Sequence, residues 1–302
     1  MPNKIRLIAT LPPLVGHRRL IIDHPAVDEL RLNTIMPISE SQKAVLKRLK
    51  EEVGKKKLWL DLKTRQLRIT QFSYLPYAFV RLSHKIQLDP PFPIHFKDGT
   101  ATVVEVVDGN KLILSDRPDR IVGEGEPVNI LDPWLKIKGF LTPGDREYIK
   151  AAKSLGMHSY MLSFTESQED IEAVRAIDPE AEICAKIESL RGLDFVQHDY
   201  SALKGVRLMA ARDDLYAQMP GGDKIKILKA LKLIVNADPK AVVASKIFTS
   251  LENQKEASLG DISDVELMRR MGYRNFMLSD GVCFREKVFS EAAKIFQSWR
   301  TS

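Results

Sequence analysis

The sequence predicts an α/β fold, a (β/α)8 TIM barrel with a small β domain inserted after barrel strand 3. Short apolar, β-branched runs alternate with longer amphipathic runs, a pattern typical of parallel strands joined by covering helices. Eight strand candidates fall within about 240 residues of framework, which fits a closed barrel better than an open sheet. Between residues 69 and 132 the helical pattern stops, and alternating strands with turn residues replace it.

The elements follow one another in a regular order. The strand candidates are residues 5–11, 27–33, 58–63, 159–164, 182–189, 206–214, 241–248 and 275–280. Helical periodicity follows most of them, at residues 39–53, 143–155, 168–177, 193–203, 223–235, 265–271 and 284–299. The connection at residues 12–26 is too irregular for a full helix, so the first strand and helix unit is degenerate.

Turn chemistry marks the inserted segment as a small β domain. Asp98-Gly99 and Asp108-Gly109 stand between alternating apolar runs, a strong hairpin pattern. Pro90, Pro91 and Pro93 indicate a rigid loop in the same segment. We therefore expect a barrel at residues 1–68 and 133–302, with residues 69–132 forming a lid.

Composition sets limits on the class of protein. The 302 residues are 44% hydrophobic and 28% charged, and 46 Lys and Arg against 40 Asp and Glu give a net charge of +6. No basic run carries interleaved aromatic residues, so small anions are expected as ligands rather than nucleic acid.

Cys184 and Cys283 are too few for a disulfide framework and are expected to pack as small apolar groups. Without a signal-peptide pattern or a long apolar run, we expect a cytoplasmic protein with no membrane contact.

Polar residues two positions apart end several strand candidates. Such spacing places both members on one face of a strand, and the carboxyl ends of barrel strands build the active site. The pairs are Arg31 with Asn33, Asp61 with Lys63, Lys186 with Glu188, and Arg212 with Asp214. A rim of salt bridges is the structural alternative. Clustered carboxylates beside a lysine suit a hard cation such as Mg²⁺, with Glu188 and Asp214 as the candidate ligands.

At this point the chain resembles the pyruvate kinase family over most of its length. The N-terminal "IRLIATLPP" and "LRLN" are similar to the family's first two strands, and "LDLKTRQLRI" is similar to the segment that leads into its mobile β domain. The later segments "LTPGDREYI", "LSFTESQEDI", "ICAKIESLRG", "MAARDDLYAQMP", "VVASKIFTSLEN" and "ISDVELMRRMGYRNFMLSDG" follow in the family's order.

The resemblance implies roles for matching residues. Glu188 and Asp214 correspond to ligands of Mg²⁺ or Mn²⁺, Lys186 to the lysine that stabilises the phosphoryl group and the enolate, and Arg31 to a phosphate-binding arginine. Ser245 replaces a threonine implicated in protonating the enolate. The resemblance further implies that Asn33 and Asp61 match two of the family's four potassium ligands and that Arg68, Thr10 and Pro13 lie on the nucleotide side. It implies substrate contacts at Asp213, Ala211, Arg212 and Ser163.

The departures from the family cluster on two sides. Ile35 and Leu62 replace two oxygen-bearing potassium ligands and Gln66 replaces a nearby acid, so the K⁺ site is expected to be lost. Met36 replaces a histidine on the nucleotide side. Asp213 replaces a glycine whose backbone contacts the substrate carboxylate, and an extra carboxylate there should weaken anion binding.

Later segments depart from the family as well. Tyr216 replaces the second glycine of the motif in which Asp213 replaces the first, and the loop "LSDGVC" is shorter than the family's. The family's C-terminal domain has no counterpart in the sequence, so its allosteric site and part of its tetramer interface are expected to be absent.

Three functions remain open. The first is Mg²⁺-dependent phosphotransferase activity between phosphoenolpyruvate or pyruvate and a nucleotide, ADP or ATP, in glycolysis. The second is a metal-dependent lyase or decarboxylase acting on a pyruvate-like 2-oxo acid through an enolate. The third is a non-catalytic paralogue that binds a metabolite. We expect a monomer or a small homo-oligomer in each case.

Overall fold

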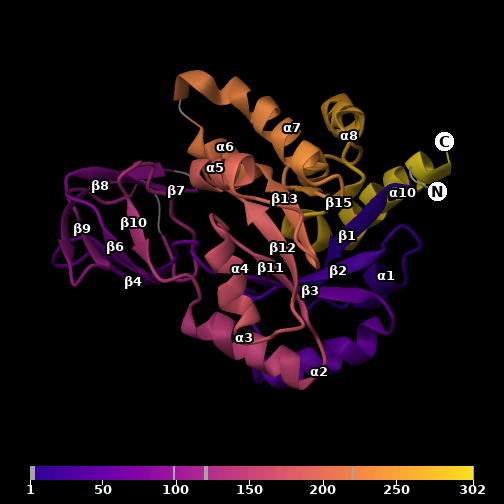
Figure 1. Cartoon of the computed structure of the whole chain (residues 1–302), viewed down its shortest axis with the longest axis horizontal. Coiled ribbons are helices and arrows are strands. Elements are labelled where there is room, and N and C mark those ends of the chain that lie inside the picture. Colours follow the sequence, from indigo (N-terminus) through magenta and orange to yellow (C-terminus); the bar gives the residue numbers. More distant parts are fainter. Residues whose placement is uncertain (1–3, 98, 119–121, 220, 302) are drawn as a thin grey trace. The chain divides into compact units, whose positions relative to one another are not determined.

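The computed structural model describes residues 4–97, 99–118, 122–219 and 221–301 (Figure 1). The chain divides into two compact units. The first consists of Met1–Leu62 with Arg146–Ser302, and the second of Lys63–Asp145.

Among the described residues of the first unit, eight parallel strands close into a barrel. They are β1 (Arg6–Thr10), β2 (Glu29–Asn33), β3 (Lys57–Leu62), β11 (Ser159–Leu162), β12 (Glu182–Ile187), β13 (Val206–Ala211), β14 (Val242–Ala244) and β15 (Asn275–Met277). Their order around the barrel is β1-β15-β14-β13-β12-β11-β3-β2. Every predicted strand has a counterpart, and the predicted fold class is confirmed.

A buried layer of side chains fills the barrel, contributed by different strands. Trp59, Met161, Cys184 and Met209 are each at most 2% exposed, so the interior is a packed core and not a channel. The polar residues that the sequence places at strand ends therefore lie outside this layer.

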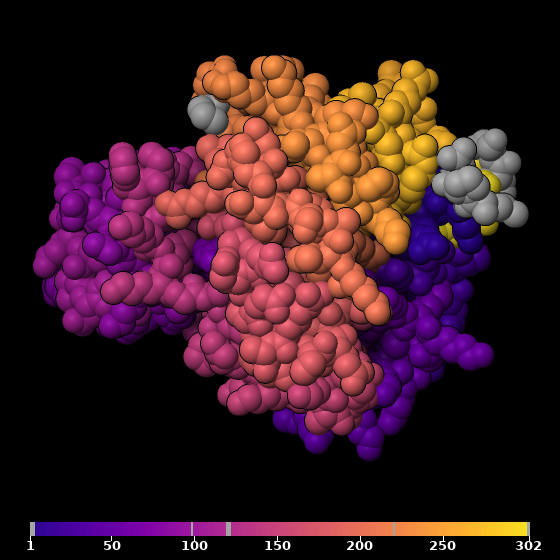
Figure 2. All heavy atoms as spheres, in the orientation of Figure 1, coloured from indigo at the N-terminus to yellow at the C-terminus, as the bar shows by residue number. Residues whose placement is uncertain are grey.

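Helices cover the barrel. In chain order they are α1 (Arg18–Asp23), α2 (Gln42–Val53), α3 (Pro143–Ser154), α4 (Gln168–Arg175), α5 (Leu190–His198), α6 (Arg212–Gln218), α7 (Ile227–Ala237), α8 (Leu259–Met271), α9 (Asp280–Cys283) and α10 (Glu286–Thr301), with 3₁₀ turns at Gly221–Lys226 and Thr249–Glu252. Helix α7 buries Leu231 and Ile234 and presents lysines outward. In the space-filling view, the N-terminal (indigo) and C-terminal (yellow) parts of this unit lie side by side (Figure 2), in agreement with the pairing of β1 with β15. No helix within the described ranges is long and apolar enough to cross a membrane.

Most predicted strands are longer than the observed ones, and two of the overruns affect site residues. The prediction for 206–214 is wrong at its end, because β13 stops at Ala211 and α6 begins at Arg212, with Asp213 and Asp214 in the first helical turn. Carboxylates are favoured there by the helix dipole. The prediction for 241–248 is also wrong at its end. Ser245 and Lys246 have φ values of 68° and 56°, and this left-handed backbone cannot continue a strand.

Several helix boundaries also differ from the prediction. Helix α8 begins six residues before the predicted residue 265, because Ser258 and Asp261 form a reciprocal capping box. The irregular connection at 12–26 holds one short helix, α1, in agreement with a degenerate first unit.

The second unit is built from antiparallel strands. Its sheet, among the described residues, has the order β4-β5-β9-β8-β7, formed by β4 (Ile69–Ser73), β5 (Phe79–Leu82), β7 (Phe92–Phe96), β8 (Gly99–Val107) and β9 (Lys111–Leu114); β6 (Lys85–Gln87) pairs with β10 (Lys136–Lys138). The Asp108-Gly109 hairpin joins β8 to β9, with both residues left-handed. Asp98 lies outside the described residues. Strands β7 and β8, on either side of it, pair antiparallel.

Candidate active site

Left-handed backbone follows the carboxyl ends of the barrel strands β11 and β14. Phe164 follows β11 with φ of 50°, and Ser245 and Lys246 follow β14, all three left-handed although none is glycine. Such conformations cost free energy and persist where the surrounding structure enforces them, often at functional sites. The carboxyl end of this barrel is therefore the candidate location of the active site.

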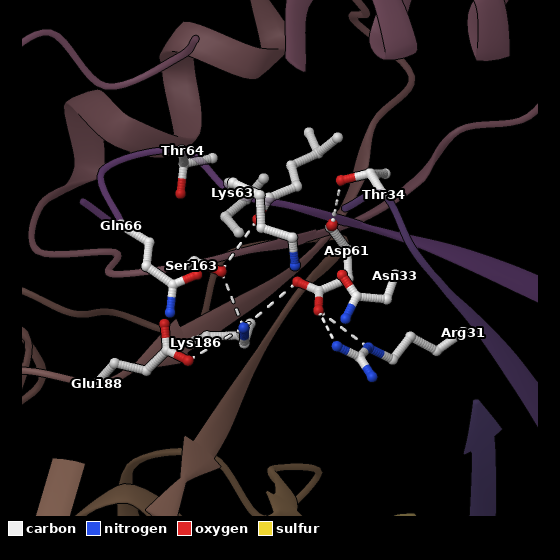
Figure 3. Close-up of polar contacts among 12 residues, drawn as sticks. Arg31, Asn33, Thr34, Asp61, Lys63, Thr64, Gln66, Ser163, Lys186 and Glu188 are labelled. Atoms are coloured by element: carbon white, nitrogen blue, oxygen red, sulfur yellow. Dashed lines mark hydrogen bonds and ion pairs between the residues drawn. The ribbon is translucent and has the colours of Figure 1, made fainter. Parts of the chain in front are cut away.

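Lys186 is the centre of a buried polar cluster at that end. Its ammonium nitrogen lies 2.9 Å from Ser163 Oγ, 3.0 Å from Glu188 Oε1 and 3.3 Å from Asp61 Oδ1 (Figure 3). The partners come from the ends of β3, β11 and β12, which are neighbours in the barrel. Strand order thus brings together residues that are far apart in the sequence.

The protonation state of Lys186 follows from this setting. Burial alone would lower its pKa, and the charge of Arg31 acts in the same direction, but the attraction of Asp61, Glu188 and Asp214 is stronger. The pKa of Lys186 is therefore raised above the usual lysine value, and the side chain stays a cation at neutral pH.

Glu188 is fixed in place from both of its oxygens. Oε1 receives the Lys186 ammonium at 3.0 Å, and Oε2 accepts a 2.8 Å hydrogen bond from the backbone N–H of Phe164. The residue is 1% exposed and follows β12 directly. The left-handed turn at Phe164 thus orients a carboxylate toward the lysine.

Arg31 is held by two carboxylates. Its Nε donates to Asp61 Oδ2 at 2.9 Å, its Nη2 also contacts that oxygen, and its Nη1 donates to Asp280 Oδ1 at 2.6 Å and to Thr10 Oγ1 at 2.9 Å. Burial alone would lower the pKa of Arg31, but Asp280 and Asp61 raise it. Asn33 Nδ2 donates to the second Asp280 oxygen at 2.7 Å.

Asp280 is the residue of this cluster that the sequence reasoning missed. It follows β15 and opens helix α9. Asp280 is a single charge after its strand and does not belong to a pair of polar residues two positions apart. The signal that could have found it is the shared feature of the other members, a charged residue within a few positions of a barrel strand's carboxyl end.

The prediction that Arg212 and Asp214 share a strand face is wrong. Both lie in the first turn of α6, where residues two apart point in different directions. The Arg212 guanidinium donates to Ser245 O at 2.7 Å and to Asp264 at 2.7 Å. Asp214, by contrast, is half-buried and close enough to Lys186 to raise its pKa. The helix therefore separates the two side chains: Arg212 contacts Ser245 and Asp264, whereas Asp214 raises the pKa of Lys186.

Asp213 lies at the exposed edge of α6. Its side chain is 59% exposed and pairs with Lys246, itself 60% exposed, at 3.1 Å. Ser245, next to Lys246, is half-buried at the end of β14, and its carbonyl accepts from Arg212. Ala211 is buried at the end of β13.

The remaining predicted positions are Thr10, Pro13 and Arg68. Thr10 accepts from Arg31 and donates to the carbonyl of Leu278, so it belongs to the cluster. The Pro13 carbonyl accepts from Arg18. Arg68 belongs to the second unit, where its guanidinium donates to the carbonyl of Gly125.

Glu188 and Asp214 suit a hard divalent cation. Within the described residues there is no group of three or more His, Cys, Asp and Glu side chains that could hold a metal. Mg²⁺ does not need such a group, because it is commonly bound by one or two carboxylates and fills its other positions with water and substrate oxygens. Each carboxylate oxygen has two lone pairs, so the contacts of Glu188 to Lys186 and Phe164 leave acceptor capacity.

The fold and the cluster define a class of protein: a β/α barrel with a lysine and carboxylates at its carboxyl mouth. Comparisons with known proteins narrow the class. The chain is 26% identical over 152 residues to a pyruvate kinase of Thermoplasma acidophilum; the match covers 49% of this chain and 27% of that protein. Its fold is similar to the crystal structure of Cryptosporidium parvum pyruvate kinase, with a TM-score of 0.75 at 16% identity, over 99% of this chain and 71% of that one.

No family model matches the chain. The aligned stretch spans about a quarter of the Thermoplasma acidophilum relative's length, and the structural match, at 16% identity, shows the fold alone. The chain is thus similar to pyruvate kinases, in sequence over 152 residues and in fold over nearly its whole length.

Proposed function

We propose that the protein is a Mg²⁺-dependent phosphotransferase that moves a phosphoryl group between phosphoenolpyruvate or pyruvate and a nucleotide, ADP or ATP. One observation carries the proposal: a buried, protonated lysine lies 3.0 Å from a buried carboxylate at the barrel mouth. A fixed cation in a site of low dielectric stabilises negative charge far better than one in water. The sequence and fold similarity to pyruvate kinases supports this choice of chemistry.

Each residue has a distinct part in the proposed reaction. Lys186 stabilises the charge that develops on the transferred phosphoryl group and on the enolate oxygen. Ser163 and Asp61 hold the lysine in position, through contacts of 2.9 and 3.3 Å. Glu188 and Asp214 would hold the Mg²⁺ ion, which when bound supplies positive charge to substrate oxygens. The Ser245 hydroxyl would donate the proton that the enolate takes up.

A coupled assay tests this function. Purified protein is given phosphoenolpyruvate, Mg²⁺ and ADP, and pyruvate is followed with lactate dehydrogenase. Lys186→Ala should lower the rate by about 10²- to 10³-fold, the usual loss when one stabilising group is removed. Lys57→Ala is the matched control, because Lys57 pairs with Glu182 at the opposite end of the barrel strands. A trace that stays flat with every nucleoside diphosphate tried would refute the proposal.

A second function, enolate chemistry without a nucleotide, is favoured by the state of Arg31. The arginine that resembles the phosphate-binding residue is engaged by Asp61 and Asp280, whereas Lys186 contacts Glu188, a proposed Mg²⁺ ligand. An enzyme acting only on a 2-oxo acid would need the lysine and the metal but not the arginine. Metal-dependent exchange of deuterium into the methyl group of pyruvate, measured by NMR without nucleotide, would support this function. Absence of exchange would exclude it.

A further inference from the structure

Asp280 is the partly solvent-exposed partner of Arg31. The arginine side chain is 9% exposed and its inner partner Asp61 is 0% exposed, whereas the Asp280 side chain is 33% exposed. Of the three charged groups, Asp280 is thus the one that meets solvent. An anion arriving from solution would approach Arg31 from the side that Asp280 occupies.

Arg31 has little capacity left for another anion. A guanidinium has five N–H donors in a rigid fork. Contacts to described residues engage four of them: two with Asp61, one with Thr10 and one with Asp280. Of these partners, Thr10 and Asp61 are fully buried. Asp280 is therefore the partner that can be exchanged for a ligand without exposing the interior of the barrel.

Asp280 is itself held in an alignment that resembles a bound ligand. One oxygen accepts from Arg31 Nη1 at 2.6 Å and the other accepts from Asn33 Nδ2 at 2.7 Å. Two donors from one strand, β2, thus converge on one carboxylate from the β15–α9 turn. A phosphoryl group or a free carboxylate would use the same two donors, because both present oxygens with similar spacing.

We propose that Asp280 is an internal counter-anion that occupies the anion subsite formed by Arg31 and Asn33, and that a substrate phosphoryl group must displace it in order to bind. The inference rests on the proposed function for the identity of the substrate, and on the contacts above for the subsite. Asp280 lowers the affinity for anions in two ways, by filling donors of Arg31 and Asn33 and by adding a second negative charge to Arg31 besides Asp61. It is a specificity-determining residue and not a catalytic one.

Inorganic phosphate is the probe, since it carries the shared chemistry without requiring turnover. Its dissociation constant is measured by calorimetry on the full chain, for the wild type and for Asp280→Asn. The amide keeps the size of the side chain and removes its charge. We expect phosphate to bind about tenfold more tightly to Asp280→Asn, a change typical of removing one like charge from a partly buried site.

Two further variants locate the effect. Glu52→Gln removes a carboxylate of helix α2 that pairs with Arg18 of helix α1, and it should leave the phosphate affinity unchanged. Arg31→Lys in the Asp280→Asn background should abolish the gain, because a lysine cannot use two N–H groups in a fork. Circular dichroism and melting temperature verify that each variant is folded.

The outcomes separate this inference from the proposed function. Unchanged phosphate affinity in a folded Asp280→Asn would overturn the inference, whatever the enzyme's activity. An equal gain in Glu52→Gln would overturn it too, because the effect would then be one of net charge. If the gain appears at Asp280 alone while the coupled assay stays flat, the counter-anion is established and the proposed phosphotransferase is not.

Discussion

Lys186 Nζ lies 3.0 Å from Glu188 Oε1 at the end of β12, and both residues are buried. The pair is stable only because other groups complete it. Asp61 and Ser163 bind the remaining lysine protons, and the Phe164 N–H binds the second carboxylate oxygen. Buried charges are costly unless they are paired and hydrogen-bonded, so each partner has measurable consequences.

Removing Lys186 should destabilise the fold as well as reduce activity. Lys186→Met leaves Glu188 buried without its cation, while Asp61 keeps Arg31 as a partner, and the free energy of unfolding should fall by about 3 kcal/mol. Urea unfolding followed by circular dichroism measures the loss. Lys57→Met, at an exposed pair, should cost less than about 1 kcal/mol. Equal losses in the two variants would mean that the buried cluster has no special role in stability.

Neutralising Asp213 should change little. Its side chain is 59% exposed and pairs with Lys246, and exposed ion pairs contribute at most about 1 kcal/mol. Asp213→Asn should therefore alter the affinity for oxalate with Mn²⁺ by less than about fivefold. This expectation differs from the one drawn from sequence, that a carboxylate at position 213 weakens anion binding. A tightening above tenfold in calorimetry would restore the sequence-based expectation.

Potassium should have no specific effect. Ile35 and Leu62 stand where the resemblance implies oxygen ligands, and the Asn33 amide and Asp61 carboxylate are engaged by Asp280 and Arg31. The phosphoryl-transfer rate and the melting temperature should be the same in potassium and in tetramethylammonium chloride at equal ionic strength. Stimulation that appears only with K⁺ would show that a site exists after all.

The two cysteines should be inert in the native state. Burial raises the pKa of the Cys184 thiol to about 11 and that of Cys283 to about 12, from an ordinary value near 9. Since the folded-state pKa values are higher, the thiols favour folding below pH 9, and this contribution is lost as the pH rises toward 11 and 12. Labelling with a thiol reagent at pH 8 should require urea. Rapid labelling of the native protein would contradict the burial of both residues.

The barrel could be predicted because its signal is repeated. Eight short apolar runs with helices between them define the class even where single boundaries are wrong. Boundaries failed where local chemistry overrides periodicity. The acidic first turn at Asp213 and Asp214 begins α6 inside a predicted strand, and the left-handed residues Ser245 and Lys246 end β14 early.

The candidate site was predictable only in part. Lys186 and Glu188 were found because the strand spacing of two places both at the barrel mouth. Asp280 was missed because its partners, Arg31 and Asn33, are brought to it by closure of the barrel between β1, β2 and β15. Contacts of that kind depend on strand order, which spacing within one segment does not reveal.

Binding of Mn²⁺ in the presence of oxalate tests the account most directly, because oxalate resembles the enolate of pyruvate and Mn²⁺ reports its own coordination. Wild-type protein should bind the ion with oxalate, as measured by electron paramagnetic resonance. Glu188→Gln and Asp214→Asn should each weaken binding by about tenfold or more, and Glu52→Gln should not. Unchanged Mn²⁺ binding in the folded Glu188→Gln and Asp214→Asn variants would contradict a shared cation site beside Lys186.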